Sequence, residues 1–277
     1  MLPELSEQDA SGDIARIYDE IKLFCAVPYV SSLQRHLATR PGWLEWCWQT
    51  VRPLFVSGIA QERAWAAAAN TKAPPLPPIP LAAQSVLGID AKGRQTLRDI
   101  ARLFVQVSPT NLAFSGIIRA VLIDGATGQA NLPAPAPWTP PAPVPTPPPL
   151  LPANDTPPDL AAALDHFSVE VDGHPFIPGL YRILAHYPGY IAYLATTLAP
   201  RFDDAPTSAA CEQVKADVDA AMRDVVKNEL PAVNLAGLPD ASEHGAVLDA
   251  IERYRETSPQ MIVFGRLIID SLPDNDC

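Results

Sequence analysis

A phrase that occurs twice constrains the fold more than any other feature of this 277-residue chain. VPYVSSLQRHLATRPGW at residues 27–43 returns as HPFIPGLYRILAHYPGY at residues 174–190, a shift of 147 positions. The identical pairs include Pro28/Pro175, Leu33/Leu180, Arg35/Arg182, Leu37/Leu184, Ala38/Ala185, Pro41/Pro188 and Gly42/Gly189. A unit that is repeated only twice, and is far longer than a solenoid unit, predicts two similar domains packed as an internal pseudo-dimer.

A second pair of segments supports the same duplication. SPTNLAFSGIIRAVL at residues 108–122 corresponds to SPQMIVFGRLIIDSL at residues 258–272, with a shift of 150 positions. Two pairs in the same order predict a first helical repeat over residues 1–131 and a second over residues 159–277. A chain of this length suits two domains of about 100–150 residues each.

Between the two repeats, residues 132–158 are predicted to form a proline-rich linker. Thirteen prolines lie between Leu132 and Asp159, a density that excludes helices and sheets and favours the extended polyproline II form. Such a segment can connect two packed domains, or it can offer a PxxP ligand to a partner protein. A second proline cluster at residues 74–81 is expected to be a loop inside the first repeat.

Helical patterns dominate the rest of the sequence, which predicts an all-α fold. In SGDIARIYDEIKLF the apolar residues recur at three- and four-residue spacing behind a candidate N-cap at Ser11. Further helices are expected over residues 33–51, 60–70, 94–105, 211–226 and 246–255. The segment SVEV at residues 168–171 is the one short strand candidate.

Composition and charge exclude several functions. Apolar residues make up 48% of the chain, enough for real cores, and the formal net charge is −11. Nucleic acid is not an expected partner, because phosphate binding needs clustered Lys and Arg. The acidic N-terminus and the lack of an apolar run of about 20 residues predict neither a signal peptide nor a membrane helix. Four scattered cysteines are typical of reduced thiols, so a cytoplasmic location is expected.

Positions that differ between the repeats are candidates for an asymmetric pocket. Gln34 corresponds to Tyr181, His36 to Ile183 and Asn111 to Met261. These exchanges of polar for apolar residues either mark a pocket or reflect surface drift.

Serine before proline, at Ser108 and at Ser258, predicts an N-cap followed by proline in the first turn of a helix. Asn111 would then lie beside free backbone N–H groups, where it could hold a carboxylate or a water, or bond locally to its own helix end.

Motifs of other enzyme classes are not found in the sequence, which has no GxSxG, GxGxxG, P-loop or HExxH. No metal site is predicted from the spacing of the five histidines. His166, Asp172 and His174 lie close together and either bind a metal or form a solvated loop. Trp43 and Trp46 have the spacing of a helix core.

The phrase GDIARIYDEIK…VPYV…RHLATRPGWLEW, the proline-rich linker and the SPTN segment together resemble the group I 2-haloacid dehalogenases, which act on both enantiomers. The resemblance implies a pseudo-dimer of two α-helical repeats, distantly similar to the alkylhydroperoxidase D-like fold. It also implies a hydrolase for carbon–halogen bonds that needs no cofactor. In that family a carboxylate activates water, and the water displaces halide from C2 of a small 2-haloacid without an ester intermediate.

The resemblance also implies roles for individual residues. Asn111 corresponds to the Asn that helps to hold the attacking water, and Phe114 to an apolar residue one turn later. Gln34 and Leu37 are expected to line the substrate pocket from the first repeat. Tyr181, Ile183 and Met261, which correspond to Gln34, His36 and Asn111 in the repeat, are expected to line it from the second repeat because these positions differ between the two halves.

The water-activating Asp, which the resemblance places in the second repeat near residues 177–188, has no evident counterpart here. Between Gly173 and Arg201 the chain contains no acidic residue, and the nearest is Asp172. Either Asp172 serves as the base, or the chain is a diverged relative that binds or converts another small carboxylate. A small carboxylic acid is the expected ligand in both cases. The sequence does not decide between a monomer and a homodimer.

Overall fold

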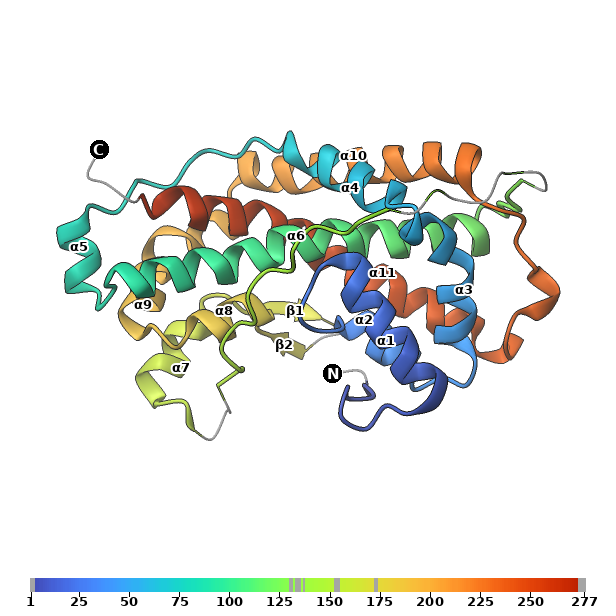
Figure 1. Cartoon of the computed structure of the whole chain (residues 1–277). Helices are drawn as coiled ribbons and strands as arrows, with labels where there is room; N and C mark the ends of the chain where they lie inside the picture. Colours follow the sequence, from blue (N-terminus) through green and yellow to red (C-terminus); the bar gives the residue numbers. More distant parts are fainter. Residues whose placement is uncertain are drawn as a thin grey trace. The chain divides into compact units, whose positions relative to one another are not determined.

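The computed structural model of the chain describes residues 3–129, 132, 136, 138–151, 155–171 and 174–273 (Figure 1). The structure is 67% helical, so the predicted all-α fold is confirmed. In the described part of the chain one small antiparallel sheet pairs β1 (Val169–Val171) with β2 (His174–Phe176). The predicted strand at residues 168–171 is therefore confirmed as well. None of the helices described combines the length and apolarity that would carry it across a membrane.

The chain forms two compact units, and each is assembled from three segments. The first contains Met1–Asn70, Val107–Val144 and Val214–Ser258, and the second contains Thr71–Gln106, Pro145–Gln213 and Pro259–Cys277. Each unit thus takes segments from both halves of the sequence. The boundaries 1–131, 132–158 and 159–277 describe the inferred duplication and stay a prediction.

The first unit contains α1 (Gly12–Cys25), α2 (Ser32–Leu37), α3 (Trp43–Val56) and α4 (Ile59–Ala69). It also contains parts of the long helices α6 (Ala91–Leu122), α10 (Ala205–Glu229) and α11 (His244–Ser271). Short 3-10 turns η3 (Leu235–Gly237) and η4 (Ala241–Glu243) precede α11. The core of this unit is apolar and fully buried, and it includes Ile17, Tyr18, Leu37, Trp43, Leu44, Phe55, Leu112, Phe114, Val218 and Ile251.

The second unit contains α5 (Leu81–Val86), α7 (Pro158–Asp165), the sheet, α8 (Gly179–Leu184), α9 (Pro188–Thr197) and η2 (Ala199–Asp203). The remaining parts of α6, α10 and α11 complete it. An aromatic cluster fills its core. Phe167 stacks on Tyr181 with ring centroids 4.4 Å apart, and Phe202 lies 4.7 Å from Phe264.

The order of the helices agrees with the inferred duplication. The short helices α2 and α8 are each six residues long and begin 147 positions apart. The long helices α6 and α11 carry the second pair of similar segments. The duplication itself remains a prediction.

The single helix expected over residues 33–51 is wrong, because the chain forms α2 and α3 there. The interruption includes Pro41, which cannot donate a backbone hydrogen bond, and Gly42, which adopts a left-handed conformation with φ 80°. Gly42 is the N-cap of α3, so the two residues end one helix and start the next.

The predicted helix starts at Ser108 and Ser258 are also wrong. Both serines lie inside continuous helices, and Pro109 and Pro259 are interior residues of α6 and α11. Proline in a helix interior costs about 3 kcal/mol. In α6 the apolar face continues on both sides of Pro109, with Leu103, Val107, Leu112 and Phe114 all buried. Burial of this stripe outweighs the cost of the proline.

The proline-rich linker forms neither helix nor strand over residues 138–151, as expected, and the loop expected at residues 74–81 is likewise irregular up to Pro80, with α5 starting at Leu81. Within the first unit the linker is attached at Trp138. Its indole N–H donates to Glu62 Oε1 at 2.8 Å, and its ring lies 6.2 Å from that of Trp65. These contacts favour the role of a connector over that of a ligand for another protein.

Replacing Gly58 by alanine is expected to lower the free energy of unfolding by more than about 2 kcal/mol. Gly58 has φ 76°, and a Cβ atom there would lie 2.3 Å from the Trp138 ring. The left-handed backbone alone costs a non-glycine residue about 1 kcal/mol. Gly88 has the same φ but open space around it, so Gly88→Ala is the matched control and should cost about 1 kcal/mol. Equal losses in urea unfolding would show that Trp138 does not pack on Gly58.

Candidate functional site

Asn111 lies in the part of α6 that belongs to the first unit, and its amide is held from two sides. Its Nδ2 donates to Ser31 Oγ at 2.9 Å, and its Oδ1 accepts from Gln34 Nε2 at 3.3 Å. Ser31 is the N-cap of α2 and Gln34 lies in the first turn of that helix. The short helix α2 therefore fixes the orientation of the Asn111 amide.

Gln34 is a buried amide with an unmatched acceptor. Its side chain is 3% exposed, and no described residue donates a hydrogen bond to its Oε1. Leaving a buried acceptor unpaired costs about 1–3 kcal/mol. We name Ser31, Gln34 and Asn111 together the amide site.

Polar contacts from the chain terminus and from α11 hold α2 in place. Leu5 donates its backbone N–H to the Arg35 carbonyl at 3.0 Å, and the Arg35 guanidinium pairs with Glu4 at 2.7 Å. The Tyr254 hydroxyl is hydrogen-bonded to the Ser32 side chain, and burial raises the pKa of this phenol to about 12. It is therefore a neutral hydrogen-bonding group at physiological pH.

His36, the next polar residue on α2, is fully buried and neutral. Its Nε2 accepts from Arg40 Nε at 3.4 Å, so Nδ1 carries the proton and donates to the Pro3 carbonyl at 2.8 Å. Burial is the main cause that lowers the pKa of His36, and Arg40 and Arg253 lower it further. The Pro3 carbonyl and Glu4 oppose this shift.

The protein is expected to lose stability in mild acid because of His36. Its folded-state pKa is lowered, so its contribution to the free energy of unfolding is fully present above the unfolded-state pKa of about 6.5. That contribution is lost as the pH falls from there through the folded-state pKa. Urea unfolding at pH 7.5 and 5.0 measures the difference. In His36→Gln, which keeps a donor and an acceptor but does not titrate, the difference should shrink; an unchanged difference would assign it to other groups.

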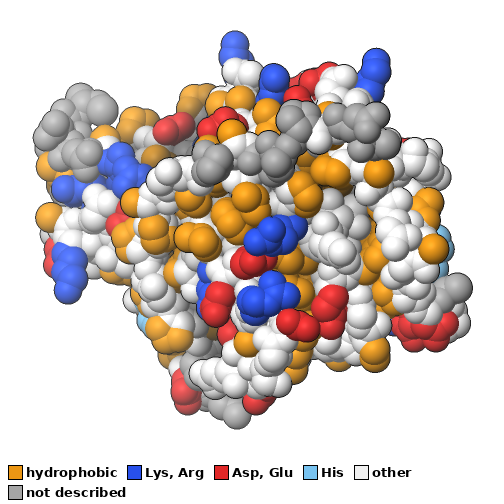
Figure 2. Space-filling view, turned by 45° about the vertical axis from the view of Figure 1, so that its right-hand side comes forward, with side chains coloured by type: hydrophobic (Ala, Val, Ile, Leu, Met, Phe, Trp, Pro, Cys, Tyr) orange, Lys and Arg blue, Asp and Glu red, His pale blue; other side chains and the backbone are white. Residues whose placement is uncertain are grey.

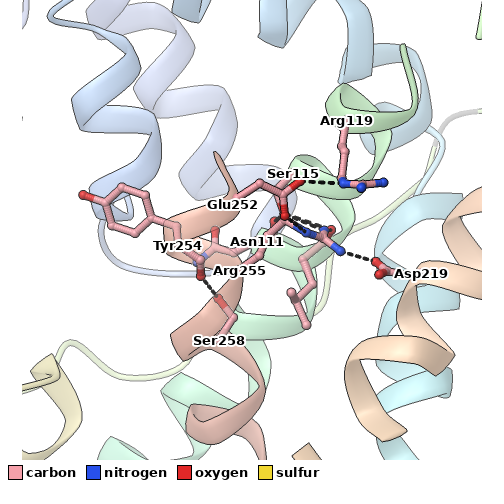
Figure 3. A network of polar contacts seen from close by, with 9 residues as sticks. Asn111, Ser115, Arg119, Asp219, Glu252, Tyr254, Arg255 and Ser258 are labelled. Atoms are coloured by element: carbon pink, nitrogen blue, oxygen red, sulfur yellow. Dashed lines mark hydrogen bonds and ion pairs between the residues drawn. The ribbon is translucent and has the colours of Figure 1, made fainter. Parts of the chain in front are cut away.

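A buried ion network lies one turn from Asn111 along α6 (Figure 3). Arg255 on α11 is 2% exposed, and its Nη1 donates to the Leu112 carbonyl at 3.3 Å and to Ser115 Oγ at 3.1 Å. Its Nη2 donates to Asp219 Oδ1 on α10 at 2.5 Å. Ser115 Oγ in turn donates to the Asn111 carbonyl at 2.8 Å. The network thus joins the turn of α6 that carries Asn111 to two other helices.

Two further features complete the network. Arg119 pairs with Glu252 at 2.5 Å, and Glu252 lies 3.9 Å from Arg255 Nε. Gly116 makes room for it, because a Cβ atom there would lie 3.3 Å from Arg255 Nη1. Two cations and two anions balance, so the network adds no net charge beside the amide site.

The other residues predicted for the pocket have different positions. Leu37 and Phe114 are core residues of the first unit. Tyr181, Ile183 and Met261 are buried in the second unit, where burial raises the pKa of the Tyr181 phenol well above its usual value. No described residue is hydrogen-bonded to the Tyr181 hydroxyl. Asp172, the predicted base, lies outside the described residues, so its role stays a prediction.

Among the residues that the structure describes, no group of three or more His, Cys, Asp and Glu side chains could hold a metal ion. The alternative of a metal at His166, Asp172 and His174 involves Asp172 and stays untested. Trp43, predicted as a core residue, is 1% exposed and Trp46 is 6% exposed. Both belong to α3.

Sequence reasoning missed Ser31, Arg255 and Asp219. A signal for two of them was present in the repeat, since Ser31 corresponds to Pro178 and Arg255 to Val105. A polar or charged residue opposite an apolar one is the same exchange that marked Gln34 and Asn111.

The surface is of mixed chemistry. On the face shown in Figure 2, Lys and Arg side chains are scattered among acidic and hydrophobic ones. The described residues of this face do not form the cluster of basic side chains that phosphate binding requires.

Comparison with known proteins gives one partial sequence match and several matches of fold. No family model matches the chain. A configuration-inverting 2-haloacid dehalogenase from Alcaligenes xylosoxydans xylosoxydans is 36% identical over 62 residues, which cover 22% of this chain and 21% of that enzyme. The match therefore spans about a fifth of the length of that relative.

Two solved structures resemble the whole chain. A D-2-haloacid dehalogenase mutant in complex with D-2-CPA has a TM-score of 0.77 and 16% sequence identity, over 99% of this chain and 96% of the other. A D-2-haloacid dehalogenase with L-LA has a TM-score of 0.75 and 16% identity, over 99% and 97% of the two chains. At this identity the likeness shows a shared all-α fold. Together with the partial sequence match, it confirms the predicted resemblance to 2-haloacid dehalogenases.

Proposed function

We propose that the protein hydrolyses the carbon–halogen bond at C2 of small 2-haloalkanoic acids. The observation that carries this proposal is the amide site, in which Ser31 and Gln34 fix the amide of Asn111. The residue that the sequence resemblance assigns to holding water is thus a partly buried amide in one defined orientation. The partial match to a configuration-inverting 2-haloacid dehalogenase supports the same reaction.

The proposed reaction is a direct displacement. Water held by the Asn111 amide attacks C2, a C–O bond forms, and the C–halogen bond breaks with its electron pair leaving on the halide. A carboxylate accepts the proton that water loses, because neutral water is a poor nucleophile. The product is a 2-hydroxy acid of inverted configuration, and no cofactor takes part.

The amide site contributes to the proposed reaction by positioning the attacking water. An enzyme without a covalent intermediate must hold water in line with the bond that breaks, and a misplacement of about 1 Å can cost about 100-fold in rate. The Asn111 amide has few orientations open to it, because both of its polar atoms already have partners. We propose Asp172 as the base, on the sequence argument alone.

Halide release from both enantiomers of 2-chloropropionate and 2-bromopropionate tests the proposal. Stoichiometric appearance of halide and 2-hydroxypropionate above the rate without protein is expected. A thermal shift with these acids, without any halide release between pH 6 and 10, would reject hydrolysis. It would favour the alternative of a relative that only binds small carboxylates.

Asp172→Asn tests the base separately. The variant keeps the size of the side chain but cannot accept the proton, so halide release is expected to fall while the thermal unfolding midpoint stays the same. Glu170→Gln, a neighbouring carboxylate in β1, is the matched control. Undiminished release by the Asp172 variant would exclude it as the base.

A further inference from the structure

Gln34 is the one member of the amide site with an unused hydrogen-bonding atom that is fully buried. Its Nε2 donates to Asn111 Oδ1, whereas its Oε1 has no donor among the described residues. Gln34 is only 3% exposed, so its side chain cannot turn this oxygen to bulk solvent. A donor that binds inside the site, beside the Asn111 amide, would satisfy this acceptor.

The hydrogen-bonding capacity of the two amides defines the chemistry of that donor. A primary amide nitrogen carries two hydrogens, and Ser31 uses one of those on Asn111 Nδ2. No described residue accepts the second hydrogen on Nδ2. One amide therefore offers a hydrogen and its neighbour offers an oxygen. A single group that both accepts and donates, an O–H group, satisfies the two together.

We propose that Gln34 and Asn111 together form a binding position for one O–H oxygen, with Asn111 donating to it and Gln34 Oε1 accepting from it. This inference rests on the proposed function, because the same O–H group is the attacking water before reaction and the 2-hydroxyl group of the product afterwards. Gln34 is thus a determinant of ligand class that favours 2-hydroxy acids over acids without a hydroxyl group.

The chemistry of an amide limits what Gln34 does. A carboxamide accepts a hydrogen bond but does not take up a proton at neutral pH, so Gln34 orients water and leaves proton removal to a carboxylate. Its role is to aim one O–H bond and thereby direct a lone pair of the oxygen toward C2.

Binding of non-reacting acids tests the inference without any turnover. Dissociation constants of both enantiomers of 2-hydroxypropionate and of propionate are measured by calorimetry on the wild type and on Gln34→Met. At least one enantiomer of the hydroxy acid is expected to bind the wild type about tenfold more tightly than propionate, the value of one neutral hydrogen bond. In Gln34→Met, which keeps the volume but has no amide oxygen, this ratio should fall to about one.

Gln61→Met is the matched control for the loss of a buried amide. Gln61 is fully buried in the same unit, and its Nε2 donates to the Phe24 and Phe55 carbonyls. Its Oε1, like that of Gln34, has no donor among the described residues, but Gln61 does not contact the Asn111 amide. This control should lower the unfolding midpoint and keep the binding ratio of the wild type. A ratio that falls equally in both variants would assign the effect to general loosening of the fold and overturn the proposal.

The attacking water is tested by kinetics with the 2-halopropionates. A halo acid has no hydroxyl group, so only the water uses Gln34, and Gln34→Met should lower kcat about tenfold with little change in KM. If Gln34→Met instead raises KM about tenfold and leaves kcat unchanged, Gln34 does not position the attacking water.

The outcomes separate this inference from the proposed function. Preference for the hydroxy acid without any halide release keeps the O–H position and rejects hydrolysis. Halide release with equal binding of the two acids, or with tighter binding of propionate, overturns the O–H position and keeps hydrolysis. Failure of both enantiomers of 2-hydroxypropionate to bind the wild type at millimolar concentration also overturns the inference.

Discussion

Asn111→Ala is expected to lower kcat for halide release about 100-fold or more. The variant removes the amide that the proposed mechanism uses to hold water. A reaction slows by about 100-fold when a reactant is displaced by about 1 Å from its productive position. The effect should lie in kcat, because the contact matters when the C–O bond forms. Steady-state kinetics with the faster enantiomer of 2-bromopropionate measures it.

Two comparisons isolate the role of Asn111. Asn228 on α10 is an exposed asparagine whose side-chain nitrogen donates to the carbonyl and the carboxylate of Asp224. Asn228→Ala therefore makes the same chemical change outside the site and should leave kcat unchanged. Ser31→Ala removes one of the two contacts of the Asn111 amide and should cost about tenfold, because Gln34 still holds Oδ1. Wild-type kcat in Asn111→Ala would contradict the proposed mechanism.

Arg255→Met is expected to lower the free energy of unfolding by about 3 kcal/mol. Removing one partner of a buried ion pair leaves the other charge without compensation, which costs about 3–5 kcal/mol. The Asp219 side chain is 25% exposed and gains some hydration, which places the expected loss at the lower end. The Leu112 carbonyl and Ser115 Oγ also lose the hydrogen bonds that Arg255 Nη1 donates to them. Urea unfolding at pH 7.5 measures the loss.

The other ion pair of the network provides the control. Arg119 and Glu252 are 40% and 43% exposed, and exposed pairs contribute about 0–1 kcal/mol. Arg119→Met should therefore cost less than about 1 kcal/mol. The double variant Arg255→Met/Asp219→Leu removes both buried charges and should recover most of the stability lost in Arg255→Met. If the double variant is less stable still, the cost lies in packing and not in the unpaired carboxylate.

The sequence predicted local structure well wherever the apolar pattern was continuous. The helix at residues 12–25, the short strand at residues 169–171 and the irregular stretch at residues 138–151 of the linker all follow from spacing and composition. The predictions at Ser108 and Ser258 are wrong because burial overrides a local signal, and the helix predicted through Pro41 is wrong because a local break was overlooked. Proline and serine usually mark helix ends, but burial of the apolar stripe continues α6 through Pro109. At Pro41 the adjoining left-handed Gly42 divides the chain into two helices.

By itself the sequence determined the all-α class, the resemblance to 2-haloacid dehalogenases and the candidacy of Gln34 and Asn111. Only the tertiary structure decided which residues these side chains are hydrogen-bonded to. Asn111 meets Ser31 across 80 positions of the chain, Gln34 meets Asn111 across 77, and Arg255 meets Ser115 across 140. Hydrogen bonds are directional and short, so pairing over such separations depends on how the helices pack, which the local spacing of residues does not specify.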